Sequence, residues 1–400
     1  MRHSFLSGTA IALCLAAHGA QAQGVAETKL TASDGAPGGR FGWSVAVSGD
    51  TVLVGELGSA AYLFDTDGTQ TAKLTGTEPE FGRSVALSGD TALVGAPAGF
   101  GTDAAYLFDA EGNETQKLTP SDGLPLISFG RSVALSDSTA LVGAPINGGD
   151  SAYLFDTDGT QTQKLTGNGG DFGFSVALSG DTALVGAPGD GSAYLFDTDG
   201  TERHKLTASD GAAAEFGYSV ALSGDTALVG ARARFSDDIG SAYLFDTDGT
   251  QRQKLTASDG AADDEFGTSV ALSGNLALVG APRDDDKGSD SGSVYLFDVR
   301  TGAELAKLTA SDGAARDLFG FSVALDGEVA VVGANNPFSP NPANAAYVYD
   351  LSPRWVATTG GAWDEGANWS SFAPSDFGFD TVINPDAGDQ VVTGPGSLSE

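Results

Sequence analysis

Short apolar runs of the types SVAL, TALVGA and AYLF recur along most of the chain, separated by polar turns. The runs show no clean alternation of apolar and polar residues, which is typical of strands whose two sheet faces are both covered. The polar words between them, SGD and TDGT, are hairpin turns in which Gly can take a positive φ. The pattern therefore predicts an all-β protein built from short antiparallel strands.

Three words recur in a fixed order, and this internal repeat is the dominant feature of the sequence. The first word is FGxSVALSG, the second is ALVGAP, and the third is AYLFD followed by a turn and KLT. The first word begins at seven phenylalanines, namely Phe41, Phe81, Phe129, Phe172, Phe216, Phe266 and Phe319. A four-stranded antiparallel unit of this kind, repeated every 40–50 residues or so, predicts a β-propeller blade, and seven copies predict seven blades.

The ends of the repeat array predict how the ring closes. KLT first occurs at Lys29, before the first FG word, and no KLT follows the last unit, which ends at Asp350. We therefore expect the N-terminal strand near Lys29 to be the outermost strand of the last blade. Seven of the eight Lys residues belong to KLT words, and on an outermost strand a Lys discourages pairing with another chain.

The repeats resemble the FG-GAP repeat, the unit of integrin alpha-chain propellers and of many bacterial surface and secreted proteins. The resemblance covers about residues 29–350 and implies the propeller fold, whereas propellers host unrelated activities. Several integrin-type blades carry an Asp-rich calcium loop between the FG and GAP strands. Here only SGD or a variant stands at that place, with too few oxygens for a 6–8-ligand site, so those calcium sites are not expected.

The segments flanking the repeats differ in composition. Residues 1–22 combine a basic start, an apolar stretch and an Ala20-Gln21-Ala22 cleavage signal, which predicts a signal peptide cut before Gln23. The propeller then spans 23–352, without a membrane-spanning helix in the mature chain. Residues 353–400 hold three of the four Trp residues and resemble the opening of autotransporter-type β-helical proteins, so we expect a β segment there that begins a further domain.

Charge and composition narrow the function. The chain has 53 acidic and 20 basic side chains and a net charge of −33, which argues against nucleic acid and anionic lipid surfaces as partners. One Cys and two of the three His residues fall in the predicted signal peptide, leaving His204. A His-based zinc site and a Cys nucleophile are therefore excluded from the mature chain. We expect no catalytic residues and no enzyme activity.

Calcium is the one cofactor for which the sequence offers candidates. In the loop from Arg283 to Gly292, the alternating carboxylates Asp284, Asp286 and Asp290 are suited to a hard cation, although a solvated acidic loop is the favoured interpretation. DTDG words resemble the start of a calcium loop, but no Glu closes a 12-residue loop, so hairpin turns are favoured there. These words begin at Asp65, Asp156, Asp197 and Asp246.

The residue after each FG varies against the repeated background. The seven are Trp43, Arg83, Arg131, Phe174, Tyr218, Thr268 and Phe321. Aromatic residues and Arg are typical of partner-binding rims. Strand alternation places this position on the same face as the motif Phe, toward the neighbouring blade, so packing between blades is the favoured alternative.

Loop lengths indicate which end of the propeller binds a partner. The SGD and DTDG turns share one face and are short, whereas the KLT–FG and GAP–AYLF loops share the other face and vary in length. Function concentrates on such variable loops. The sequence thus predicts an exported, non-enzymatic, monomeric scaffold that binds a protein or glycan partner at the cell exterior, in an adhesin-like role. The alternatives are a secreted polysaccharide-degrading enzyme and a structural spacer in a larger autotransporter-like surface protein.

Overall fold

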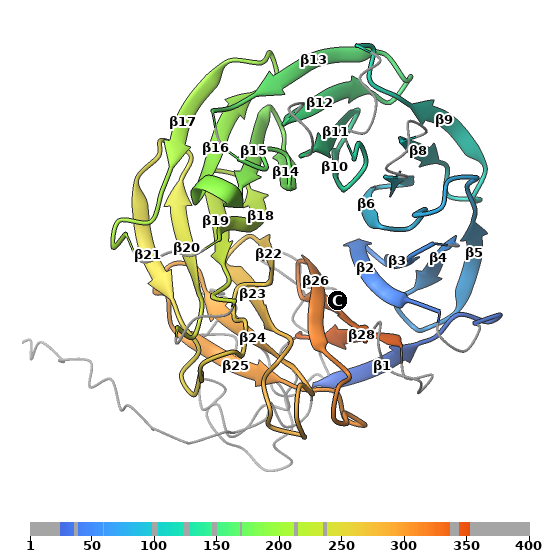
Figure 1. The fold of residues 1–400 in the computed structure, drawn as a ribbon. Helices are drawn as coiled ribbons and strands as arrows, with labels where there is room; N and C mark the ends of the chain where they lie inside the picture. The colour runs from blue at the N-terminus through green and yellow to red at the C-terminus, as the bar shows by residue number, and fades with distance from the viewer. Residues whose placement is uncertain are drawn as a thin grey trace, which may run out of the picture.

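The computed structural model describes residues 25–35, 39–58, 60–97, 103–122, 128–145, 150–168, 170–211, 215–234, 238–336 and 344–352. These residues form seven sheets of four antiparallel strands, arranged as a ring (Figure 1). The predicted all-β, seven-bladed propeller is confirmed. The predicted signal peptide and the Trp-rich segment 353–400 lie outside the described residues. Among the residues described, no helix has the length and apolar character needed to cross a membrane.

Each blade places the repeated words in the same order from the axis outward. The innermost strands carry the SVALS word and are β2 (Phe41–Ser48), β6 (Ser84–Ser88), β10 (Ser132–Ser136), β14 (Ser175–Ser179), β18 (Phe216–Ser223), β22 (Ser269–Ser273) and β26 (Phe319–Asp326). The second strands carry the VGA word and are β3 (Thr51–Glu56), β7 (Thr91–Ala96), β11 (Thr139–Ala144), β15 (Thr182–Ala187), β19 (Thr226–Ala231), β23 (Leu276–Ala281) and β27 (Val329–Ala334).

The two outer strands follow the same rule. The third strands carry the AYLF word and are β4 (Ala60–Asp65), β8 (Ala104–Phe108), β12 (Ser151–Asp156), β16 (Ser192–Asp197), β20 (Ser241–Asp246), β24 (Ser293–Asp298) and β28 (Ala345–Asp350). The outermost strands carry the Lys and are β5 (Gln70–Leu74), β9 (Glu114–Leu118), β13 (Gln161–Thr166), β17 (Glu202–Leu206), β21 (Gln251–Leu255), β25 (Glu304–Leu308) and β1 (Ala26–Leu30). One 3₁₀ turn, η1 (Pro188–Asp190), joins β15 to β16.

The N-terminal strand closes the ring. β1 pairs antiparallel with β28, with Lys29 opposite Tyr347, and completes the sheet β1-β28-β27-β26. Figure 1 shows β1 in blue beside the orange-red strands of the last blade. The first and last parts of the repeat array therefore share one sheet, as the position of the first KLT predicts.

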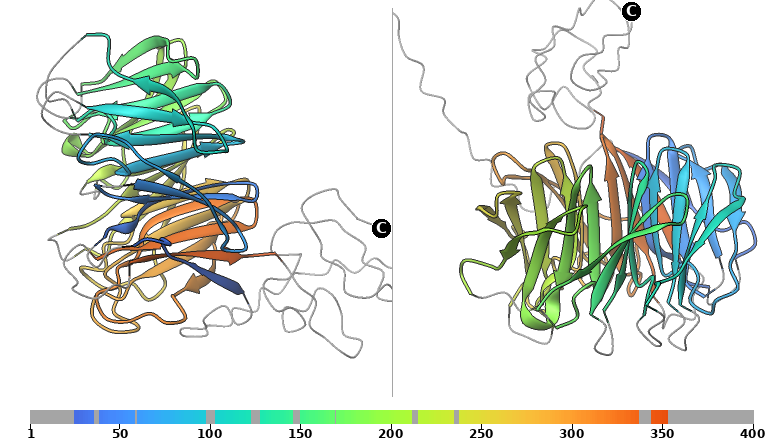
Figure 2. Two further views of the ribbon diagram at one scale, coloured as in Figure 1. Left: turned by 90° about the vertical axis from the view of Figure 1, so that its right-hand side faces the viewer. Right: turned by 90° about the horizontal axis from the view of Figure 1, so that it is seen from above.

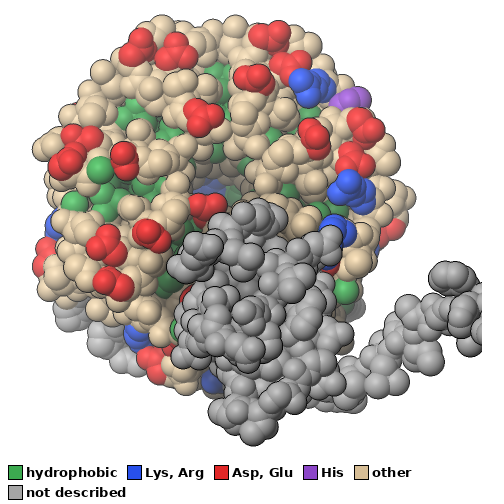
Figure 3. All heavy atoms as spheres, turned by 180° about the vertical axis from the view of Figure 1, so that it is seen from behind, with side chains coloured by type: hydrophobic (Ala, Val, Ile, Leu, Met, Phe, Trp, Pro, Cys, Tyr) green, Lys and Arg blue, Asp and Glu red, His purple; other side chains and the backbone are tan. Residues whose placement is uncertain are grey.

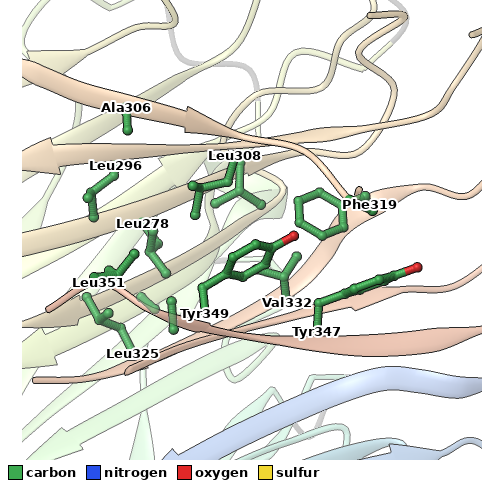
Figure 4. Packing of buried hydrophobic residues seen from close by; sticks show 14 of the residues in the cluster. Leu278, Leu296, Ala306, Leu308, Phe319, Leu325, Val332, Tyr347, Tyr349 and Leu351 are labelled. Carbon is green, nitrogen blue, oxygen red and sulfur yellow. The ribbon is translucent and has the colours of Figure 1, made fainter. Parts of the chain in front are cut away.

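The hydrophobic core is divided into seven layers, one between each pair of neighbouring blades. The second and third strands are buried on both faces, which is why their sequences lack alternation. In the layer between the sixth and seventh blades, Phe319 packs edge-on against Tyr347 and Tyr349, with centroids 5.6 and 6.1 Å apart (Figure 4). Every motif Phe makes the same two contacts with the aromatic residues of its own AYLF strand.

The FGxS word is a joint between blades. The Ser hydroxyl of each blade donates a hydrogen bond to the carbonyl of the FG glycine in the next blade, as from Ser44 to Gly82 at 3.1 Å, and the seventh, from Ser322 to Gly42, closes the circle. Gly82 has φ +86, and a Cβ there would lie 2.4 Å from the carbonyl oxygen of Ala60. Only Gly permits this backbone approach.

The two ends of the propeller have different characters. Figure 2 shows η1 on one face and the end of β28 on the opposite face. The face with η1 carries the KLT–FG and GAP–AYLF loops and is called here the variable-loop face. The opposite face carries the SGD and DTDG hairpins, where Asp and Glu side chains recur around the ring (Figure 3). We call it the short-turn face.

Candidate functional site

The seven variable residues after FG form one ring at the propeller axis. Each lies at the start of an innermost strand, on the variable-loop side of the serine joint. We call this set the mouth ring: Trp43, Arg83, Arg131, Phe174, Tyr218, Thr268 and Phe321. Ring and cation–π contacts across blades join Trp43 to Phe321 and Arg83, and Phe174 to Tyr218 and Arg131. The six predicted binding-face residues therefore lie around one end of the axis.

Two aromatic pairs lie on different parts of the mouth ring. Trp43 and Phe321 have centroids 4.9 Å apart, and Phe174 and Tyr218 have the same separation. These four side chains are only partly buried. The predicted packing between blades is therefore present, and it leaves aromatic surface at the axis.

The motif Phe and the mouth-ring residue pack against different blades. A β-bulge separates Phe41 from Ser44 in β2, because the ladder shifts register there, and the intervening glycine has φ +83. Simple strand alternation does not extend through such a bulge. Phe41 packs inside its blade on Tyr62, whereas Trp43 reaches the neighbouring blade.

Two arginines occupy adjacent positions between the aromatic pairs. The guanidinium of Arg83 lies 5.3 Å from the Trp43 ring centroid, and that of Arg131 lies 4.0 Å from the Phe174 centroid. Arg83 also pairs with Glu80 at 2.9 Å. In the part of the chain that the structure describes, Arg131 forms no ion pair. Burial, with added repulsion from Arg83, lowers the pKa of Arg131 to about 10.

Sequence reasoning missed two further arginines at this site. Arg40 lies 5.7 Å from the Trp43 centroid, and Arg232 lies 3.6 Å from the Tyr218 centroid. Arg232 also pairs with Glu215 at 2.6 Å. The signal for Arg232 was present, since it replaces the Pro of the GAP word in the fifth blade.

The acidic loop from Arg283 to Gly292, whose carboxylates were the weak calcium candidates, is organised around protein cations. Asp284 and Asp286 contact the ammonium of Lys307 at 2.9 and 2.6 Å, and Asp290 pairs with Arg283 at 3.4 Å. Asp284 is buried and also accepts hydrogen bonds from Ser293, Tyr295 and the backbone N–H of Asp286. Among the described residues, no group of three or more His, Cys, Asp or Glu side chains is arranged to hold a metal ion.

The DTDG words form hairpin turns, the favoured interpretation. In the first blade, the backbone N–H of Asp65 donates to the carbonyl of Thr69, and the backbone N–H of Thr69 donates to the carboxylate of Asp67, both at 2.9 Å. The bond from Thr69 lowers the pKa of Asp67. The same turn recurs at Asp158, Asp199 and Asp248. The carboxylate is thus engaged within the turn.

The seven KLT lysines lie on the outermost strands, and their ammonium groups have specific partners. Each lies 5.1–5.5 Å from the ring centroid of the AYLF Tyr opposite it and 2.5–3.1 Å from a carboxylate. In six blades that carboxylate comes from the loop that leads in from the preceding blade. We call the three groups together the lysine latch. In the fourth blade, Asp190 of η1 supplies the carboxylate to Lys205.

Comparison with known proteins agrees with the architecture. Seven segments match the family described as FG-GAP repeat: residues 25–70, 69–108, 113–155, 160–196, 201–245, 250–297 and 303–349. Among solved structures, the chain is similar to the computationally designed Ika8 protein, with 15% identity and a TM-score of 0.52 over 79% of this chain and 98% of that one. At this identity the likeness concerns the fold alone. No curated protein matches the chain significantly.

Proposed function

The chain belongs to the FG-GAP repeat family, and we propose that it is an exported, non-enzymatic propeller scaffold that binds a protein or glycan partner at the cell exterior in an adhesin-like role. The signal-peptide pattern of residues 1–22 supports export. The partner binds on the variable-loop face, with the mouth ring at its centre.

The mouth ring is the observation that carries this proposal. The other positions of the FGxSVALSG word repeat because they make the joints and cores between blades. The third position differs from blade to blade and holds the residue types enriched where proteins bind partners, Trp, Tyr, Phe and Arg. The repeated blades form a rigid scaffold, and the mouth ring places variable aromatic and cationic side chains at its centre. Such an arrangement is suited to binding a partner.

The proposal is tested by incubating the full chain on arrays of extracellular-matrix proteins and glycans. Trp43→Ala and Arg131→Thr should each weaken specific binding. The Thr at position 268 indicates that the ring accommodates that side chain. Arg203→Thr is the matched control, because Arg203 lies in the exposed outermost strand β17. Absence of specific binding, or equal binding by all three variants, refutes the proposal. Breakdown of an arrayed polysaccharide favours the enzyme alternative.

A further inference from the structure

The mouth ring contains a cationic segment with an incomplete set of partners. Arg83 and Arg131 are neighbours in the ring, and only Arg83 has a carboxylate, Glu80, within ion-pair distance in the described part of the chain. Two guanidinium groups side by side repel each other, and partial burial strengthens that repulsion. A further anionic group between them would relieve it.

The contacts of Arg131 leave its N–H donors available. A guanidinium is planar, and its N–H groups point outward in that plane. The guanidinium carbon of Arg131 lies over the Phe174 ring, 4.0 Å from its centroid, and among the described residues no hydrogen bond or ion pair engages its N–H groups. A carboxylate accepts two parallel hydrogen bonds from the edge of a guanidinium.

The charge of the whole molecule restricts which kind of partner can supply that carboxylate. The net charge is −33, and Asp and Glu side chains recur around the short-turn face (Figure 3). A uronic-acid polysaccharide carries one negative charge per sugar, so the negative charge of this protein repels it along many of its sugar units. A protein that presents one isolated carboxylate, on a surface otherwise neutral or basic, is attracted.

The geometry also favours an end-on approach. The mouth-ring residues lie at the starts of the seven innermost strands, which surround the axis (Figure 1). A group reaches them along the axis, with the Trp43–Phe321 and Phe174–Tyr218 pairs as apolar flanks. A protruding side chain meets this requirement, whereas a polysaccharide presents its carboxylates sideways.

We infer that the mouth ring recognises a single acidic side chain, Asp or Glu, which a partner protein inserts along the propeller axis between Arg83 and Arg131. This inference rests on the proposed function and specifies the chemistry of its partner. Arg131 is the principal donor and Arg83, shared with Glu80, is the second.

The probe is an array of cyclic peptides that each present one Asp or Glu at the tip of a turn, printed beside the same peptides with Asn or Gln and beside polygalacturonate and neutral glycans. The full chain should bind a subset of the acidic-tip peptides and not their amide counterparts. Arg131→Thr should weaken this binding about tenfold or more, as expected for loss of a charge-assisted hydrogen-bond pair. Arg131→Lys should weaken it less, and Arg203→Thr should leave it unchanged.

Several outcomes overturn the inference. These are equal binding of acidic and amide peptides, acidic-peptide binding that survives Arg131→Thr, and absence of acidic-peptide binding. Preferred binding of polygalacturonate through Arg131 replaces the protein partner with an acidic glycan. Binding of neutral glycans or amide peptides that Trp43→Ala abolishes leaves the proposed function standing while this inference fails. Equal melting temperatures of wild type and Arg131→Thr establish that the variant is folded.

Discussion

Replacing Lys307 by Met tests how the latches hold the propeller together. Lys307 is 7% exposed and contacts Asp259, Asp284 and Asp286, and the Asp284 side chain is 5% exposed. Burial alone would lower the pKa of Lys307, but hydrogen bonds to these carboxylates raise it above its ordinary range. Loss of the ammonium leaves the buried Asp284 carboxylate without its cation. Removing one partner of a buried ion pair lowers the free energy of unfolding by about 3–5 kcal/mol.

The fifth blade provides the matched control. Lys254 and Asp210 form the same latch at 2.7 Å, with side-chain exposures of 35% and 36%. Lys254→Met should therefore cost only about 0–1 kcal/mol. At roughly 2 °C per kcal/mol for a protein of this size, the melting temperature should fall by about 6–10 °C for Lys307→Met and by at most about 2 °C for Lys254→Met.

A second substitution separates the effect of charge from that of packing. Asp284→Asn added to Lys307→Met should recover part of the loss, because the buried charge is removed. Similar losses for Lys307→Met and Lys254→Met, or no recovery when Asp284→Asn is added to Lys307→Met, would show that the burial argument is wrong.

Three further predictions follow from single contacts. Gly82→Ala should lower the free energy of unfolding, measured in urea titrations, by more than about 4 kcal/mol, because the added Cβ would meet backbone atoms. Gly89→Ala should lower it by only about 1–2 kcal/mol, because Gly89 has φ +52 but open space around it, and equal losses would contradict this. Burial raises the pKa of the Glu78 carboxyl, but bonds from Lys117 and Tyr106 outweigh it and hold the pKa below its ordinary value. Its stabilisation should thus persist at neutral pH and be lost only as the pH falls below about 4, and Glu78→Gln should flatten the acid limb of the melting curves. Calcium titration of the full chain by calorimetry should give no heat, and chelator should leave the melting temperature unchanged, because Asp284 is held by Lys307; tight binding with a raised melting temperature would restore the calcium hypothesis.

The fold was accessible to sequence reasoning because each repeated word has one structural role. The apolar runs predict the buried strands, the FG glycine predicts a close backbone approach, and the unmatched first KLT predicts the closing strand β1. Repetition supplies seven independent copies of each pattern, so the period identifies the blade. No comparable repetition marks the site.

The candidate site was only partly accessible for the same reason. Its residues were singled out by their variation, but their mutual contacts depend on which blades are neighbours and, in β2, β18 and β26, on a bulge at the FG word. Alternation along one strand cannot anticipate that bulge. The alternating aspartates of the loop after Arg283 suggested calcium as a weak alternative to a solvated loop, because residue spacing shows which side chains could bind a cation but not which cations of the protein already occupy them. Lys307 lies 23 residues beyond Asp284 in sequence, and only the pairing of β24 with β25 brings its ammonium to that carboxylate.

The order of residues around the mouth ring is itself informative. Phe321 is followed by Trp43 across the closing joint, Arg83 by Arg131, and Phe174 by Tyr218, so that like residues are neighbours. Neighbouring aromatic residues stabilise each other, which packing alone explains. Adjacent arginines at a narrow axis repel each other, and this repulsion adds to burial, the larger cause, in lowering the pKa of Arg131. Placing Arg83 and Arg131 side by side does not stabilise the propeller. We therefore propose that the two cations are kept together because they bind a carboxylate of a partner.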